Sequence, residues 1–337
     1  MTAIYFATNR KKDGTGNFGY GGELVTLDDA AVTYGVAEVS NVKLSNEDSG
    51  NIKPLKQITT GNFTDATQQA IVDAGRDVLV FIHGASNTFE NAIKRAAFNC
   101  EWFAAAGVGA AKTTVVAFTW PSMPVRIGNT LGGYRRDQNQ AGKCGLHLRA
   151  FFLNIVTLRQ KLKAANPAAR VFLLAHSMGN HALQAGIRSW FEAQGPEGRI
   201  FDQVFHAAAD EVAETYLQDG VGMRPLMQLS DRISIYFSRE DRLMWASAAA
   251  NNNARLGFNG PTDKMDSGPY PKRKFRIVDC TQALDFSLLF PWDASHQYYR
   301  RSKAVRNDIA ACMLDDPRPS GGLSEITTLV APDPVLA

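Results

Sequence analysis

The sequence has few cysteines and no long apolar run, and its first residues do not show the pattern expected of a secretory leader. Its four cysteines are scattered without a Cys-x-x-Cys pair, so their spacing supports neither a disulfide framework nor a zinc site. No apolar run approaches the roughly 18 residues of a membrane helix. No positive charge precedes the short apolar start, as a signal peptide would require. We therefore expect a reduced cytoplasmic protein without a membrane span.

Charge of one sign is also scarce. The chain has 36 Lys and Arg against 33 Asp and Glu, a formal net charge of +3 over 337 residues. Its basic clusters, Arg10-Lys11-Lys12, Lys272-Arg273-Lys274 and Arg300-Arg301, are short, and we interpret them as solvated surface. This composition argues against a nucleic-acid partner. With 45% hydrophobic residues, a chain of this length can bury a large core.

Six short apolar runs rich in β-branched and aromatic residues predict buried strands. They are residues 78–82, 114–118, 171–175, 203–207, 233–237 and 275–278. Amphipathic helical patterns lie between them, and the first begins after an N-cap predicted at Asn87, with Glu90 three residues later. Strand and helix alternate, which predicts an α/β architecture with a mostly parallel sheet flanked by helices.

One domain accounts for most of the chain, with its core at residues 61–312. Residues 1–60 hold two expected strands, 4–7 and 36–39, which we predict to extend the same sheet at its edge. Residues 245–274 are rich in Asn, Gly and Pro and predict an insertion, either a lid or a surface loop. Residues 313–337 read as a loop-like C-terminal tail.

The strongest chemical signal is Leu173-Leu-Ala-His-Ser-Met-Gly-Asn-His181. Ser177 lies between an apolar strand and an amphipathic helix, with the small residues Ala175 and Gly179 two positions to either side. A nucleophile elbow needs this pattern, because the serine takes a strained backbone position and small neighbours let the turn close. An ordinary helix N-cap is the alternative, but the buried strand before the serine favours a nucleophile.

A second signal, Phe81-Ile-His-Gly-Ala85, ends another predicted strand. A backbone N–H in this loop can face the elbow and bind a developing oxyanion. The predicted donors are the N–H groups of Met178 and Ala85. His83 is expected beside the substrate, where it braces the oxyanion loop rather than acting as a base.

The predicted general base is His296, one of six histidines. It follows the last predicted strand, and a loop there can return over the carboxyl edge of the sheet, where ligands bind in open α/β sheets. The acid is expected between the serine and the histidine in the chain. Asp241 and Asp210 both come just after predicted strands. Asp241 is preferred, and Asp210 stays open.

These residues resemble the α/β-hydrolase superfamily of esterases and lipases, through His83-Gly84, Ala175-His-Ser-Met-Gly179, Asp241 and His296. The similarity narrows to a bacterial subfamily catalogued as a domain of unknown function. Its features are matched by Ala7-Thr-Asn-Arg10, Phe118-Thr-Trp-Pro-Ser122, Tyr134 to Asp137, Ser238-Arg-Glu-Asp241 and His296-Gln-Tyr298, over residues 3 to 300 or so. The resemblance implies the α/β-hydrolase fold and a triad of Ser177, Asp241 and His296. It supplies no substrate.

The expected activity is hydrolysis of a small-molecule carboxylic ester through an acyl-enzyme, with no metal and no organic cofactor. A thioesterase or an amidase would use the same residues. A catalytically silent hydrolase fold that binds a ligand is the alternative from another class. Met123 and Val125, with Ile127 and Leu131, are candidates to line a pocket for short or medium acyl chains, and plain packing against the sheet is equally open. The oligomeric state stays unknown.

Overall fold

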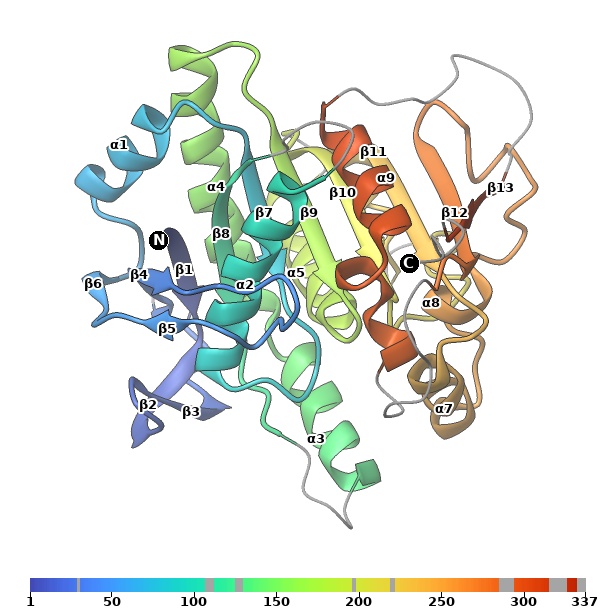
Figure 1. The fold of residues 1–337 in the computed structure, drawn as a ribbon, viewed down its shortest axis with the longest axis horizontal. Coiled ribbons are helices and arrows are strands. Elements are labelled where there is room, and N and C mark those ends of the chain that lie inside the picture. The colour runs from blue at the N-terminus through green and yellow to red at the C-terminus, as the bar shows by residue number, and fades with distance from the viewer. Residues whose placement is uncertain are drawn as a thin grey trace, which may run out of the picture.

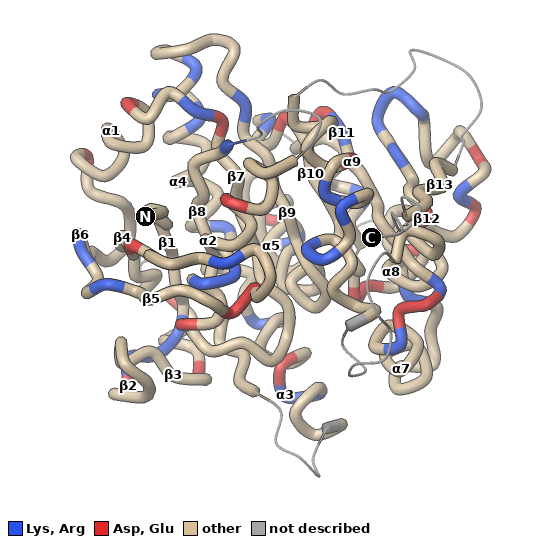
Figure 2. Tube along the Cα trace, in the orientation of Figure 1, with Lys and Arg blue, Asp and Glu red and all other residues tan. Residues whose placement is uncertain are grey.

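The computed structural model describes residues 1–28, 31–106, 112–124, 130–195, 198–218, 222–284, 294–314 and 326–331. Its centre is a sheet covered by helices on both faces (Figure 1). The strands follow the order β13-β12-β11-β10-β9-β7-β8-β1-β4-β5, and β6 pairs with β4 beside β5. Basic and acidic residues are interspersed along the trace in the view of Figure 2.

The six predicted strands form the parallel centre of this sheet. They are β7 (Val78–Ile82), β8 (Thr114–Thr119), β9 (Val171–His176), β10 (Phe201–Ala207), β11 (Ser230–Phe237) and β12 (Phe275–Gln282). Most of their residues are buried because helices cover both faces, which explains the continuous apolar runs. The predicted mostly parallel α/β sheet is confirmed.

The N-terminal segment extends this sheet, as predicted. Strand β1 (Thr2–Thr8) pairs parallel with β8 and antiparallel with β4 (Thr33–Ser40). Strands β5 (Asn51–Ile52) and β6 (Lys56–Thr60) pair antiparallel with β4. Between β1 and β4, strands β2 (Arg10–Thr15) and β3 (Gly19–Leu24) form a separate two-stranded sheet.

The helices bury the two faces of the sheet in two separate cores. The described helices are α1 (Asp65–Asp73), α2 (Phe89–Ala104), α3 (Thr130–Gly142), α4 (Gly145–Ala165), α5 (Gly179–Gln194), α6 (Leu226–Leu229), α7 (Arg242–Asn251), α8 (Leu256–Asn259), the 3₁₀ helix η2 (Ala294–Arg300) and α9 (Lys303–Leu314). Val80 packs with α4 and α5 on one face, and Phe81 packs with α2 and α9 on the other. Among the described helices, none is both long and apolar enough to cross a bilayer.

Two local expectations were wrong. The N-cap of α2 is Thr88, not Asn87, because the Thr88 side chain accepts the hydrogen bond from Asn91 N at 3.1 Å. The tail beyond residue 313 was expected to be loop-like, but its residues 326–330 form β13 (Ile326–Val330), which pairs parallel with β12. Its β-branched run suits a strand.

The segment expected to be an insertion carries α8 and most of α7. It is tied to the end of β10, since Gly257 N donates to Ala209 O at 2.9 Å. A Cβ on Gly257 would lie 2.3 Å from the Ala208 carbonyl carbon, so this close approach requires glycine. The segment therefore packs over the carboxyl end of β10, beside the predicted site.

Candidate active site

Ser177 occupies the sharp turn between β9 and α5. Its φ of +53° lies in the left-handed region, which is strained for any residue with a side chain. The strained turn is held by the end of β10, because Ser177 N donates to Ala207 O at 3.0 Å and Ser177 O accepts from Asp210 N at 3.1 Å. Such strain persists only where the surroundings enforce it, as they do at functional sites.

Two glycines allow the elbow to approach the loop after β7. A Cβ on Gly179 would lie 2.5 Å from His83 O, and one on Gly84 would lie 2.8 Å from Ser177 Cβ. No real side chain tolerates these distances. Gly179, two positions after the serine, is therefore needed so that the turn can close, as its spacing suggested, and Gly84 is required from the opposite side.

The two predicted oxyanion donors lie on these facing segments. Met178 is the N-cap of α5, and Ala85 directly follows Gly84. Among the described residues, neither backbone N–H has a hydrogen-bond acceptor. The N-terminus of α5 also contributes partial positive charge, which favours an anion at this position.

His83 is bonded to the backbone through both ring nitrogens. Its Nε2 accepts from Trp120 N at 3.1 Å, and its Nδ1 donates to Gly84 O at 2.8 Å. Burial and the charge of Arg10 hold the pKa of His83 well below its usual range, so the ring is neutral. Its ring also stacks on Trp120, with centroids 5.2 Å apart. These contacts leave neither nitrogen for a substrate and suit the bracing role.

His296 is paired with Asp241. The distance from His296 Nδ1 to Asp241 Oδ2 is 2.8 Å, and the two side chains are 4% and 0% exposed. The other oxygen of Asp241 accepts from Met244 N at 3.0 Å and caps α7. His296 belongs to the 3₁₀ helix η2, whereas the sequence indicated a loop. The carboxylate is thus fixed by the helix cap on one side and faces the imidazole on the other.

The same imidazole lies beside the elbow. Its centroid is 4.8 Å from that of His176, the residue before Ser177, and His176 Nε2 lies 3.4 Å from His296 O. Burial and the nearby His296 and Arg300 hold the pKa of His176 well below its usual range. Among the described residues, Ser177 Oγ forms no hydrogen bond, so the hydroxyl is free to turn.

Asp210, the alternative acid, has different partners. Its Oδ2 accepts from Tyr134 OH at 2.9 Å, and its Oδ1 accepts from Ser247 Oγ. Arg255 Nε lies 3.5 Å from Oδ1. The structure thus brings Asp241, and not Asp210, to His296.

Sequence reasoning missed the polar frame behind the Gly84–Ala85 loop. Arg10 was interpreted as solvated surface, but it is 1% exposed. It donates to Ser122 O at 3.0 Å and to Asn87 O at 2.9 Å, while burial lowers its pKa to about 9. Asp137 Oδ2 accepts from Ser86 N at 3.0 Å. The subfamily motifs around Arg10, Ser122 and Asp137 were the available signal, and they converge on this loop.

The predicted pocket-lining residues are only partly described. Met123 is half-buried and packs against Gly22 of β3, while Leu131 is exposed. Val125 and Ile127 lie outside the described residues. Within the described part of the chain, no group of three or more His, Cys, Asp or Glu side chains could hold a metal ion.

A mostly parallel sheet whose elbow serine follows a central strand and opens a helix defines an α/β-hydrolase fold. The chain belongs to the family described as alpha/beta hydrolase of unknown function (DUF900), whose profile matches residues 60–310. No curated protein matches the chain. A solved structure, the product of gene lin2722 from Listeria innocua, is similar over 75% of this chain and 98% of its own, at 9% identity and a TM-score of 0.35.

Proposed function

We propose that the protein is a serine hydrolase that cleaves a carboxylic ester through an acyl-enzyme. Ser177 is the nucleophile, His296 the general base and Asp241 the acid that orients it. The observation that carries this proposal is the 2.8 Å pairing of His296 with Asp241 beside a left-handed serine. A hydrolase of this fold needs that constellation in that chain order.

The proposed reaction follows from which nitrogen faces the acid. Because His296 Nδ1 donates to Asp241, Nε2 carries the lone pair that takes the Ser177 proton as Oγ attacks the acyl carbon. The N–H groups of Met178 and Ala85 stabilise the oxyanion, and the imidazolium returns its proton to the leaving alcohol. Water, activated by His296, then releases the acid and restores Ser177. The nucleophile–base contact commonly tightens only when substrate binds.

The proposed substrate is a small ester with a short or medium acyl chain. Met123 and Val125 are the proposed lining of its acyl site, from the segment after β8. The bracing of His83 would keep the Ala85 N–H fixed while the substrate enters. A thioester or amide substrate would pass through the same steps.

The test is hydrolysis of p-nitrophenyl esters from acetate to palmitate by wild type and Ser177→Ala. The variant should lose on the order of 10³-fold or more in kcat, since the nucleophile is removed while packing barely changes. Ser189→Ala, at another buried serine on α5, is the matched control and should keep wild-type activity. Activity of Ser177→Ala within about tenfold of wild type would exclude this nucleophile. A folded wild type inert toward every ester would favour a binding protein.

A further inference from the structure

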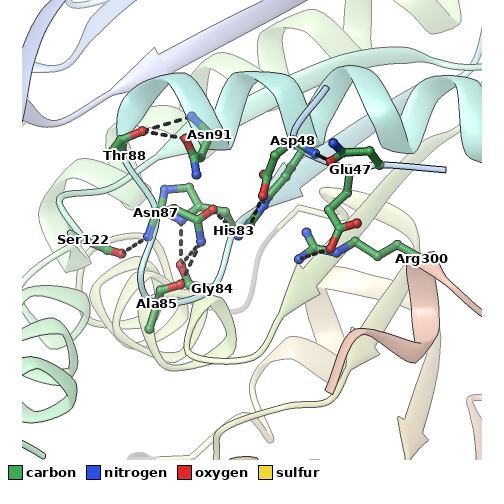
Figure 3. Close-up of polar contacts among 12 residues, drawn as sticks. Glu47, Asp48, His83, Gly84, Ala85, Asn87, Thr88, Asn91, Ser122 and Arg300 are labelled. Atoms are coloured by element: carbon green, nitrogen blue, oxygen red, sulfur yellow. Dashed lines mark hydrogen bonds and ion pairs between the residues drawn. The ribbon is translucent and has the colours of Figure 1, made fainter. Parts of the chain in front are cut away.

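The loop between β4 and β5 carries two adjacent acidic residues, Glu47 and Asp48, in a compact turn. Asp48 N donates to Asn46 Oδ1 at 2.9 Å. Across the base of the turn, Lys43 N donates to Ser49 Oγ at 2.8 Å and Lys43 O accepts from Asn46 N at 3.0 Å. These bonds hold the two carboxylates in place on the loop. The carboxylates reach in different directions (Figure 3).

Asp48 fixes Arg95 of α2 through two parallel contacts. Arg95 Nε donates to Asp48 Oδ1 at 2.7 Å, and Nη2 donates to Asp48 Oδ2 at 3.0 Å. Bidentate pairs of this kind hold a guanidinium in one orientation as well as one place. The remaining nitrogen, Nη1, donates to Asn87 Oδ1.

Arg95 in turn decides which way the Asn87 amide faces. A guanidinium only donates hydrogen bonds, so Oδ1 must face Arg95 and the NH₂ must face the opposite side. There the NH₂ donates to Gly84 O at 3.0 Å and to Ala85 O at 2.8 Å (Figure 3). Asn87 is therefore not a helix cap but the link between α2 and the loop after β7.

The Gly84 carbonyl controls the neighbouring N–H. In a trans peptide the C=O of Gly84 and the N–H of Ala85 point in opposite directions. Two donors, Asn87 Nδ2 and His83 Nδ1, hold that carbonyl oxygen. They consequently aim the Ala85 N–H to the other side, where it meets no acceptor among the described residues.

Glu47 reaches the segment that carries His296. Its Oε1 accepts from Arg301 Nη2 at 2.7 Å and lies 3.6 Å from Arg300 Nη2. The Arg300 side chain is 1% exposed, and its Nε and Nη2 have no hydrogen-bond partner within the described part of the chain. A buried guanidinium is costly unless an opposite charge compensates it. Burial raises the pKa of Glu47, but the two arginines outweigh that and lower it to about 2, so the compensating charge is present at neutral pH.

We propose that Glu47 and Asp48 are positioning residues that fix two segments of the proposed active site relative to each other, the oxyanion loop and the segment that carries His296. Asp48 sets the oxyanion loop through Arg95 and Asn87, and Glu47 sets η2, and with it His296, through Arg300 and Arg301. One loop of the N-terminal extension thus links the segment of the oxyanion donor to the segment of the base. We call this pair of contacts, through Glu47 and Asp48, the clamp. The inference rests on the proposed function, since both ends of the clamp matter only if Ser177 reacts.

The test needs no natural substrate. A fluorophosphonate reacts with an activated serine and places its phosphoryl oxygen where an oxyanion would lie, so its second-order inactivation rate constant reports the geometry of the site. Asp48→Ala should lower this constant about 10- to 100-fold, because the Ala85 N–H loses its fixed direction. Glu38→Ala is the matched control: Glu38 is also on the N-terminal extension and pairs with Lys56 at the surface. It should stay within about threefold of wild type.

A double-mutant cycle separates positioning from general destabilisation. Asn87→Ala should cost on the order of 10²-fold. Because Asp48 acts through Asn87, the double variant should fall no more than about threefold below Asn87→Ala alone. Full multiplication of the two single effects would overturn the proposed chain of contacts. All variants are compared while circular dichroism shows them folded.

Glu47 acts through Arg300 and Arg301 rather than through Asn87. A double variant of Glu47 and Asn87 should therefore behave differently from the double variant of Asp48 and Asn87. Glu47→Gln should lower the rate constant about tenfold, and its effect should multiply with that of Asn87→Ala to within about threefold, because Glu47 and Asn87 share no hydrogen-bond partner among the described residues. If Glu47→Gln does not fold, the Asp48 cycle decides. A wild type that fails to label overturns the proposed function and this inference with it. A wild type that labels at Ser177, with Asp48→Ala labelling at the wild-type rate, overturns the clamp alone.

Discussion

Two histidine–carboxylate pairs lie at the carboxyl edge of the sheet, one buried and one partly exposed, and they differ in what surrounds the imidazole ring. His296 Nδ1 is 2.8 Å from Asp241 Oδ2, and His181 Nδ1 is 2.6 Å from Glu211 Oε1. Each carboxylate follows a parallel strand, β11 or β10. The ring of His296 packs against His176 beside the elbow. The pairing distance alone therefore does not single out a general base.

The His181 pair faces α3 instead. His181 Nε2 lies 3.5 Å from the position that a Cβ on Gly142 of α3 would take. His181 and Glu211, together with Arg255, line a polar cavity of about 250 Å³. Burial lowers the pKa of His181, but Glu211 and Asp210 outweigh it and raise the pKa. A protonated imidazole has no lone pair with which to accept a serine proton. The raised pKa favours the protonated form of His181, in which this pair is an ion pair between α5 and the segment after β10.

The largest expected difference between the pairs is catalytic. Asp241→Asn should cost on the order of 10⁴ in kcat, because the imidazole loses the partner that fixes its tautomer. Glu211→Gln, the matched change in the other pair, should stay within about tenfold of wild type. Initial rates with p-nitrophenyl butyrate measure both. A larger loss in Glu211→Gln would assign the base to His181.

For stability, in contrast to activity, we expect Asp210→Asn to be a more damaging change than Asp241→Asn. Asn keeps one acceptor oxygen, but Arg255 loses its ion-pair partner and an NH₂ replaces an oxygen that accepts from Tyr134 or Ser247, which should cost about 2–4 kcal/mol of unfolding free energy. Asp241→Asn keeps an N-cap on α7 and should cost less than about 1 kcal/mol. Urea unfolding compares them. If Asp210→Asn instead lost activity as Asp241→Asn is expected to, the acid would lie after β10.

The smallest expected difference concerns pH. A histidine whose folded pKa is raised contributes stability that is fully present below its unfolded pKa, about 6.5, and is lost as pH rises through the folded value. His181→Asn should therefore be destabilised most near about pH 5.5 and least near about pH 8.5, since these values lie on either side of the usual histidine pKa of about 6.5. Unfolding free energies at those two pH values measure it. A pH-independent difference would mean that His181 carries no ionised contact.

The sheet and the elbow were predictable because their signals are local. Most central strands are runs dominated by apolar residues, and the elbow is a fixed spacing of small residues around Ser177. His296 and Asp241 followed from chain order, although order could not choose between Asp241 and Asp210. That choice depends on which strand end the η2 segment packs against, and no local pattern encodes it.

The frame around the site escaped prediction because its contacts are long-range. Arg10 and Arg300 sit in basic clusters that look solvated, yet their partners lie far away in the chain, at Ser122 and Glu47. Asn87 and Thr88 are both good capping residues, so sequence could not tell which one begins α2. Glu47 and Asp48 lie in an ordinary polar loop, and only the fold brings them to Arg300 and Arg95.

The central claim is that Ser177 is an activated nucleophile. The most direct measurement is reaction of the folded wild type with a fluorophosphonate, followed by mass spectrometry of the proteolysed adduct. The account predicts one phosphonylated residue, Ser177, and no adduct in Ser177→Ala. Modification at a different serine, or a folded wild type that takes up no probe, would contradict it.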